Sequence, residues 1–376
     1  YIRRQRQMCI RDRSFYSCQK EEQTDGSADE KSTALFTLLE PEKTGFDFKN
    51  EVVNKKQMNI FKYRNFYNGG GVAIGDINND GLSDIYMTGN MGPNKLFLNK
   101  GNFEFEDITE KAGVAGTKPW STGVNMADIN GDGLLDIYVS NAGHLEGNNH
   151  DNDLYINNGD LTFTEDAAAY NLANTGFSIH ATFFDYDKDG DLDAYILNNS
   201  NIPVSSLGYA EQREIRAKDW EGVPDIFKGV GDMLLENKDG VFTDVSEKAG
   251  IYGSLIGFGL GVMISDVNND LYPDIYISND FYERDYLYIN NGDGTFKEDV
   301  KNRASHIGLS AMGVDIADIN NDGLTDIFVT DMLPEGDHRQ KSVMEFEGYN
   351  ICLLYTSPSP RDGETHRVCR LLLEKG

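Results

Sequence analysis

The sequence predicts an all-β protein assembled from repeated four-stranded antiparallel units. Two features of the 376-residue chain support this prediction. A nine-residue acidic loop recurs five times, and each copy is followed directly by a run with the alternation of a β-strand. In the later units, Asn-Gly or Asp-Gly pairs separate two further apolar runs, which is a strong short-range signal for a hairpin.

The two ends of the chain differ in character from the repeats. Residues 1–13 and 351–376 resemble peptides translated from sequencing-adapter DNA, and we exclude them from the fold prediction. The alternatives are a basic signal-peptide n-region at the front, which no apolar h-region follows, and a disordered tail at the back. On the favoured interpretation, the chain is a fragment cut at both ends.

Residues 14–43 form the second predicted segment. Ser17 precedes Cys18, and an acidic Lys-Glu-Glu run follows, which resembles the lipidation site and export signal of Bacteroidetes surface lipoproteins. A lipid on Cys18 and the polar tether of residues 19–40 would place the protein outside the cytoplasm, on the outer-membrane surface. The alternative is a chance Ser-Cys pair before a charged linker.

The acidic loops lie in the third predicted segment, residues 44–350. Every copy has Asp or Asn at positions 1, 3 and 5 and Asp at position 9, and four have Gly at position 6. Alternating oxygen-bearing side chains around a sharp turn are how a short loop wraps a hard cation, so we expect about five Ca²⁺ sites. The alternative is ordinary Asn/Asp/Gly turns between strands. The candidate side-chain ligands are Asp76, Asn78, Asp80 and Asp84; Asp128, Asn130, Asp132 and Asp136; Asp185, Asp187, Asp189 and Asp193; Asp266, Asn268, Asp270 and Asp274; and Asp318, Asn320, Asp322 and Asp326.

These loops are not EF-hands, although they begin like one. An EF-hand needs a bidentate acidic residue at position 12. That position is apolar in all five copies, where the chain has Met87, Val139, Ile196, Ile277 and Val329. Because strands precede and follow each loop, the ion would instead hold the bend of a β-hairpin.

The first unit shows how four strands fit into one repeat. We predict strands at 71–75, 84–88, 95–99 and 103–108, and four antiparallel strands in about 50 residues describe one β-propeller blade. Five loops therefore predict four complete blades and part of a fifth. The third interval between loops is the longest, and its surplus falls within residues 198–231.

This insertion contains an amphiphilic stretch, Tyr209–Trp220, which we predict to be helical. A long ordered insertion often carries function, and the alternative is a decoration that only covers neighbouring surface.

Composition excludes several classes of protein. The net charge of −28 argues against nucleic-acid binding, which needs a basic face. No run of about 20 apolar residues exists, so a membrane contact would come only through the lipid anchor. The four cysteines, Cys9, Cys18, Cys352 and Cys369, lie outside the loops, so disulfides do not hold the array.

The loops and strands together resemble the FG-GAP (VCBS) repeats of integrin α-subunit propellers. They are similar also to bacterial relatives of cartilage acidic protein 1, which end in an ASPIC/UnbV domain. The segments that carry the resemblance are Asn68–Asp76, the five loops, Phe105–Gly113, Phe242–Gly250 and Thr330–Pro334.

The resemblance implies a seven-bladed propeller that is used mostly for binding and holds calcium in its hairpin loops. It assigns metal ligation to positions 1, 3, 5 and 9 and to the position-7 carbonyl. The residues at position 7 are Leu82, Leu134, Asp191, Tyr272 and Leu324. Because Leu271 replaces Gly at position 6 of the fourth loop, that site is the least certain.

Two functions remain open. The favoured one is a non-enzymatic, calcium-binding surface propeller with a protein or glycan ligand, and the alternative is a carbohydrate-active or other hydrolase that uses the propeller pocket. The six histidines show no metal or triad spacing, and no nucleophile motif occurs. Residues 279–286 combine aromatic and charged side chains, which predicts either a contact surface or a solvated loop with a satisfied Arg–Asp pair.

Overall fold

The structure, a computed structural model, describes residues 35–143, 149–200, 213, 215–219, 221, 231–281, 283–308 and 310–332. The chain divides into a first unit, residues 1–40, and a second unit, residues 41–376. The described residues of the first unit, 35–40, form no helix or strand. Cys18 and residues 1–34 lie outside the described residues, so the lipoprotein prediction remains untested.

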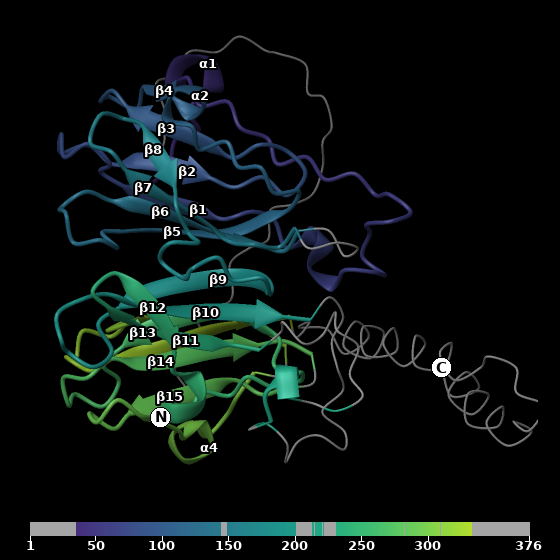
Figure 1. Cartoon of the computed structure of the whole chain (residues 1–376), viewed down its shortest axis with the longest axis vertical. Coiled ribbons are helices and arrows are strands. Elements are labelled where there is room, and N and C mark those ends of the chain that lie inside the picture. Colours follow the sequence, from purple (N-terminus) through teal and green to yellow (C-terminus); the bar gives the residue numbers. More distant parts are fainter. Residues whose placement is uncertain are drawn as a thin grey trace, which may run out of the picture. The chain divides into compact units, whose positions relative to one another are not determined.

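The second unit consists of antiparallel sheets in which the strands follow one another in chain order (Figure 1). Four sheets have four strands, and a fifth has two. We call them blades 1 to 5. Blade 1 contains β1 (Val72–Gly75), β2 (Asp84–Met87), β3 (Lys95–Asn99) and β4 (Phe105–Asp107); blade 2 contains β5 (Ser121–Ala127), β6 (Asp136–Asn141), β7 (Asp153–Asn157) and β8 (Phe163–Glu165); blade 3 contains β9 (Phe177–Phe184), β10 (Asp193–Asn199), β11 (Met233–Lys238) and β12 (Val241–Asp244); blade 4 contains β13 (Gly259–Ser265), β14 (Asp274–Asn279), β15 (Tyr286–Asn290) and β16 (Phe296–Glu298); blade 5 contains β17 (Ala311–Ala317) and β18 (Asp326–Asp331). The predicted all-β fold of four-stranded blades is confirmed.

Helices are few and short. They are α1 (Pro41–Thr44), η2 (Arg64–Tyr67), α2 (Thr109–Ala112), η3 (Ala217–Asp219), α3 (Ser246–Ala249) and α4 (Val300–Arg303). The predicted helix over 209–220 falls mostly outside the described residues, and only its Ala217–Asp219 turn is described, as a 3₁₀-helix. Among the described residues, no helix has the length and apolar character needed to cross a membrane.

The blades succeed one another around their first strands. Strand β1 contacts β5, β5 contacts β9, β9 contacts β13, and β13 contacts β17, as expected when blades are arranged around a central axis. Each blade is a twisted sheet with two faces to bury, so the core lies between neighbouring blades. Tyr86 and Leu96 of blade 1, for example, share one buried cluster with Ile137 and Val139 of blade 2. Equivalent clusters join blades 2 and 3, 3 and 4, and 4 and 5.

A polar residue just before the third strand braces each complete blade. We call this residue the clamp. Its Oδ1 accepts a hydrogen bond from a backbone N–H that lies just beyond the apolar part of the second strand, at 2.8–3.2 Å. The clamp residues are Asn94, Asn152, Asp232 and Asp285, and the N–H donors are Gly89, Asn141, Asn198 and Asn279, respectively.

Candidate functional site

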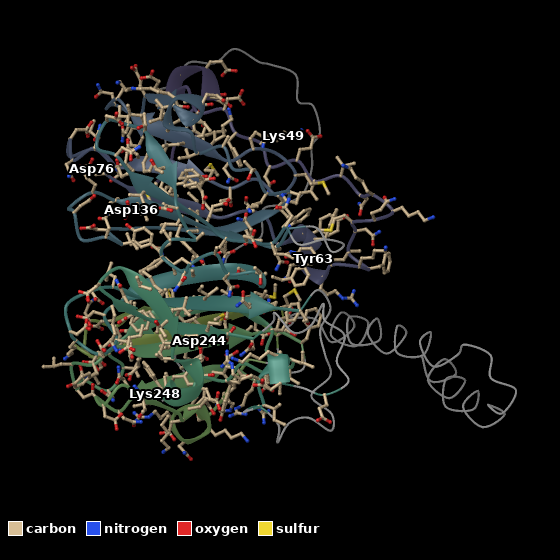
Figure 2. The ribbon with its side chains drawn as sticks, viewed as in Figure 1. Lys49, Tyr63, Asp76, Asp136, Asp244 and Lys248 are labelled. Atoms are coloured by element: carbon tan, nitrogen blue, oxygen red, sulfur yellow. The ribbon has the colours of Figure 1, made fainter. Side chains whose placement is uncertain are left out.

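Each acidic loop joins the first strand of a blade to the second (Figure 2). Backbone N–H groups hold the side-chain oxygens in place. In the first loop, Gly81 N donates to Asp76 Oδ2 at 2.7 Å and Leu82 N donates to Asp80 Oδ1 at 2.9 Å. The bond from the position-6 N–H to the position-1 carboxylate occurs in all five loops, at 2.7–3.1 Å. The five copies therefore share one backbone geometry.

The fourth loop keeps this geometry in spite of Leu271. The residue has φ +74°, close to the +82° to +102° of the glycines at position 6 of the other loops. Its N–H donates to Asp266 Oδ2 at 2.8 Å, as the glycines do. A left-handed conformation costs a non-glycine residue about 1–2 kcal/mol, so the loop holds its shape under local backbone strain.

Position 9 connects each loop to the rest of its blade. Asp84 is fully buried, and its carboxylate accepts hydrogen bonds from Ile77 N at 3.0 Å and from Asn99 N of β3 at 2.8 Å. Asp136, Asp193 and Asp274 accept the equivalent pairs in blades 2 to 4. Burial raises the pKa of Asp136 to about 6 and that of Asp193 to about 7, and neighbouring loop carboxylates contribute. Position 9 therefore has a structural role whether or not an ion is bound.

The third loop gathers the most carboxylates. One oxygen from each of Asp185, Asp187 and Asp193 lies within 4.8 Å of the others. Asp185 Oδ1 and Asp191 Oδ1 are buried and have no hydrogen-bond partner among the described residues. Burial, followed by the charge of Asp189, raises the pKa of Asp191 to about 6. A set of convergent carboxylate oxygens with free lone pairs fits a hard divalent cation such as Ca²⁺.

The loops also contact one another across blades. Asn79 Nδ2 of the first loop donates to Gly133 O of the second at 3.1 Å. In blades 3 and 4, Lys188 Nζ of the third loop lies 4.1 Å from the ring centroid of Tyr272 in the fourth. Because every loop follows the first strand of its blade, the loops lie at the same end of the first strands.

The described residues of the segment 279–286 are, by contrast, buried or half-buried. Glu283 is 2% exposed and Asp285 is fully buried. Arg284 forms an ion pair with Glu298, and Arg213 Nη2 lies 2.9 Å from Glu283 Oε1. The structure favours the predicted alternative in which the arginine is paired, but the partner of Arg284 is Glu298 of β16 and not an aspartate. The predicted solvated loop does not agree with the burial of Glu283 and Asp285.

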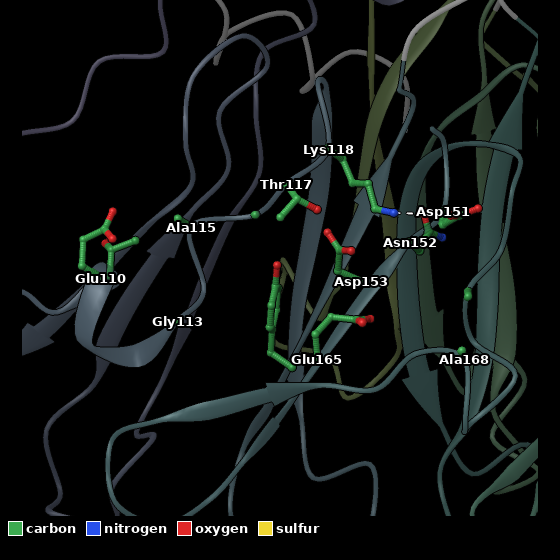
Figure 3. A pocket seen from close by; sticks show the side chains of 14 residues that line it. Glu110, Gly113, Ala115, Thr117, Lys118, Asp151, Asn152, Asp153, Glu165 and Ala168 are labelled. Carbon is green, nitrogen blue, oxygen red and sulfur yellow. Dashed lines mark hydrogen bonds and ion pairs between the residues drawn. The ribbon is translucent and has the colours of Figure 1, made fainter. Parts of the chain in front are cut away.

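Sequence reasoning missed a crevice of about 520 Å³ between blades 1 and 2 (Figure 3). Asp153 and Glu165 line it, and Lys118 Nζ reaches Asp151 Oδ2 at 3.4 Å. Burial raises the pKa of Asp153 to about 6, against hydrogen bonding from Asn141 and the charge of Lys118. The strand register pairs Tyr155 with Glu165, so alternation along β7 and β8 was the signal for this carboxylate pair.

Comparison with known proteins supports the repeat assignment. The model of the FG-GAP-like repeat matches residues 63–139 and 266–329, which include the first, second, fourth and fifth loops. Cartilage acidic protein 1 of Xenopus tropicalis is 45% identical over 78 residues, and that of Homo sapiens is 42% identical over 76 residues. Each match covers 20% of this chain and only 12% of the relative.

A similar solved structure is that of an Agrocybe aegerita lectin, described as recognising non-reducing terminal N-acetylglucosamine. It aligns with a TM-score of 0.37 and 19% identity, and the alignment covers 68% of this chain and 59% of the lectin chain. The predicted resemblance to FG-GAP repeats is confirmed for the two matched segments, which contain strands of blades 1 and 2 and of blades 4 and 5.

Proposed function

We propose that this protein is a non-enzymatic binding module whose blades are held by calcium in the acidic loops. The observation that carries the proposal is the third loop, where two buried carboxylate oxygens have no partner and three carboxylates converge. The same backbone geometry in the other four loops extends the proposal to about five sites. The FG-GAP-like repeats support a binding role rather than catalysis.

Calcium would supply positive charge at a point where the fold collects carboxylates. The chain contributes the oxygens of positions 1, 3, 5 and 9 and the position-7 carbonyl. Position 9 then links the ion to the third strand, since Asp193 already accepts Asn237 N at 2.8 Å. Because an ion that binds only the folded state stabilises it by mass action, each occupied loop would strengthen its own blade.

Thermal unfolding with calcium and with chelator tests this role. Calcium sites of extracellular modules often have dissociation constants on the order of 10⁻⁴–10⁻³ M. At about 10 mM Ca²⁺ each site would add roughly 1.4–2.7 kcal/mol to the free energy of unfolding. We expect the midpoint to rise with calcium, and the rise to shrink stepwise as Asp80, Asp132, Asp189 and Asp322 are replaced by Ala. An identical midpoint in chelator would show that the loops are only turns.

We further propose that Cys18 carries a lipid that tethers the module to the outer-membrane surface, where it meets a protein or glycan partner. The basis is the sequence pattern around Cys18 and the acidic tether that follows it. Metabolic labelling with a fatty-acid analogue tests the anchor. Label that persists after Cys18→Ala would exclude this residue as the attachment point.

The hydrolase alternative has one observation in its favour, the carboxylate pair of Asp153 and Glu165 in the crevice between blades. General acid catalysis uses a carboxyl group whose pKa lies near the working pH, as that of Asp153 does. Turnover of aryl glycosides that is lost in both Asp153→Asn and Glu165→Gln would favour this alternative. Absence of turnover in the unmodified protein would favour the binding module.

A further inference from the structure

A second pocket, of about 410 Å³, lies where the first strands of the blades begin. The segment before blade 1 and the first strands of blades 2 to 5 contribute to it. Asn65 and Tyr67 come from the segment before β1, Gly123 from β5, His180 from β9, Leu260 from β13 and Met312 from β17. The acidic loops follow the other end of the same strands, so the calcium sites and this pocket are at opposite ends of β1, β5, β9, β13 and β17.

The repeat register identifies His180 as an exception within the pocket wall. Five residues before the first Asp of each loop stand Gly71, Gly123, His180, Gly261 and Gly313. The glycines allow neighbouring first strands to approach closely. A Cβ on Gly71 would lie 2.8 Å from Thr122 O, and one on Gly123 would lie 2.6 Å from Ile179 O. At this repeat position, only blade 3 has a residue with a side chain, the imidazole of His180.

His180 packs against the space that Gly123 leaves open, since a Cβ on Gly123 would lie 2.5 Å from His180 Nδ1. Burial lowers the pKa of His180, which keeps the ring neutral and leaves it one donor and one acceptor nitrogen.

Asn65 supplies a second polar side chain to the pocket wall. It is 4% exposed, and its Oδ1 accepts a hydrogen bond from Asn68 Nδ2 at 3.1 Å. Its Nδ2 has no hydrogen-bond partner among the described residues. Burial raises the pKa of the Tyr63 hydroxyl, and the Asn65 side chain opposes this rise. The Tyr63 hydroxyl, like Asn65 Nδ2, has no hydrogen-bond partner among the described residues. An unpaired buried donor is unfavourable, and a ligand oxygen would satisfy it.

The pocket wall is uncharged, although the whole chain carries a net charge of −28. Among the described residues, no Asp, Glu, Lys or Arg lines it, so it lacks the charged side chains that usually hold a phosphate or a hard metal cation. It combines amide and imidazole groups with apolar surface from Leu260 and Met312, and the Tyr67 ring beside it is 60% exposed. Its volume falls in the range of small-molecule sites, roughly 300–1,000 Å³.

We propose that this pocket binds one ring of a neutral saccharide. A ring hydroxyl can accept from Asn65 Nδ2 and another can donate to the His180 imidazole, while the apolar ring face packs on Leu260, Met312 or Tyr67. The proposal rests on the binding function above and names the site and ligand class for it.

The test titrates the full chain, at saturating Ca²⁺, with neutral methyl glycosides of glucose, galactose, mannose and N-acetylglucosamine, by calorimetry and saturation-transfer NMR. Two charged analogues, glucosamine and glucose 6-phosphate, are included. We expect one or more neutral glycosides to bind and the charged analogues not to bind. Because each variant removes one hydrogen bond to the ligand, Asn65→Asp and His180→Gly should each weaken binding by up to about tenfold, which corresponds to about 1.4 kcal/mol.

His180→Gly restores the residue found in the other four blades, so it tests the imidazole with the smallest risk to folding. Asp151→Asn in the crevice between blades 1 and 2 is the matched control and should leave affinity unchanged. Binding unaffected by His180→Gly, or lost in Asp151→Asn, would overturn the pocket assignment. No neutral glycoside binding in a protein whose midpoint still responds to calcium would overturn the saccharide proposal and leave the calcium-held module standing.

Discussion

Blades 1 and 2 differ from blades 3 and 4 at the clamp. The first two use Asn94 and Asn152, and the second two use Asp232 and Asp285. All four accept the same backbone N–H through Oδ1, so the blade geometry is preserved. The substitution from amide to carboxylate changes only what the other side-chain atom can do.

The nearby tyrosine reverses its hydrogen bond accordingly. In blade 2, the Tyr138 hydroxyl donates to Leu172 O at 2.9 Å and accepts from Asn152 Nδ2 at 2.9 Å. In blade 3, the Tyr195 hydroxyl donates to Asp232 Oδ2 at 2.9 Å. The backbone N–H bond to Oδ1 is the same in both blades. Asn and Asp can therefore replace one another at the clamp, because the tyrosine O–H can rotate to donate to a carboxylate oxygen or to accept from an amide nitrogen. Only a clamp with a carboxyl group can make the stability of its blade depend on pH.

The largest effect should come from removing a clamp. Asp232→Ala leaves Asn198 N and the Tyr195 hydroxyl without their acceptor, and both residues are at most 1% exposed. With about 1–3 kcal/mol for each unpaired buried group, we expect the free energy of unfolding measured in urea to fall by roughly 2–6 kcal/mol. Asn152→Ala should lose a similar amount. A loss below about 1 kcal/mol in either variant would show that the clamps are not needed.

The second-largest effect should be a pH dependence of the unfolding free energy that the Asp clamps cause and the Asn clamps do not. Burial raises the pKa of Asp232 to about 7, while hydrogen bonds from Tyr195 and Asn198 and the charge of Arg216 oppose the rise. The folded protein therefore keeps this proton between about pH 4 and pH 7, where the unfolded chain has released it. The contribution of Asp232 to the free energy of unfolding should be fully present below about pH 4. It should fall by up to roughly 4 kcal/mol as the pH rises to 7, and it should stay constant at higher pH.

Asp232→Asn copies the clamp of blade 2 and removes this titration. We expect the difference in unfolding free energy between pH 4.5 and 7.5 to be smaller in the variant than in the unmodified protein. Asn152→Asp is the reverse exchange and should add a loss of stability over the same range. Equal pH profiles in all three proteins would contradict a protonated Asp232.

A smaller effect should follow from the strained loop of blade 4. Leu271 has the left-handed φ that blade 2 gives to Gly133, and it is 76% exposed. Leu271→Gly removes the strain but gives the unfolded chain more freedom, so we expect a net gain of about 0.5–1 kcal/mol. Chemical unfolding in chelator measures it without the ion. Gly133→Leu should destabilise, and a loss of stability in Leu271→Gly would contradict the strain.

The smallest effect concerns the contacts between loops. Blades 3 and 4 use Lys188 over Tyr272, whereas blades 1 and 2 use the bond from Asn79 to Gly133. An exposed cation–π contact contributes about 0.5–1 kcal/mol. Lys188→Met should lower stability by this amount in chelator and Asn79→Ala by a similar amount. An unchanged midpoint in Lys188→Met would show that the Lys188–Tyr272 contact is not stabilising.

The sequence by itself determined the repeating unit. The loops, the strands beside them and the hairpins are local features, because turn residues and two-residue alternation act over a few positions. The predicted 95–99 strand is β3 with the same bounds. The predicted partial fifth blade corresponds to β17, which precedes the fifth loop, and β18, which follows it. The loop residues could be located for the same reason.

Only the tertiary structure decided how these units use their polar groups. Asn290 Nδ2 donates to Tyr186 O from 104 residues away, and Asn65 of η2 and His180 of β9 line the same pocket. The two unpaired oxygens of the third loop likewise depend on what surrounds Asp185 and Asp191. Whether a donor or acceptor is satisfied depends on distant neighbours and on burial, and neither is encoded in local spacing.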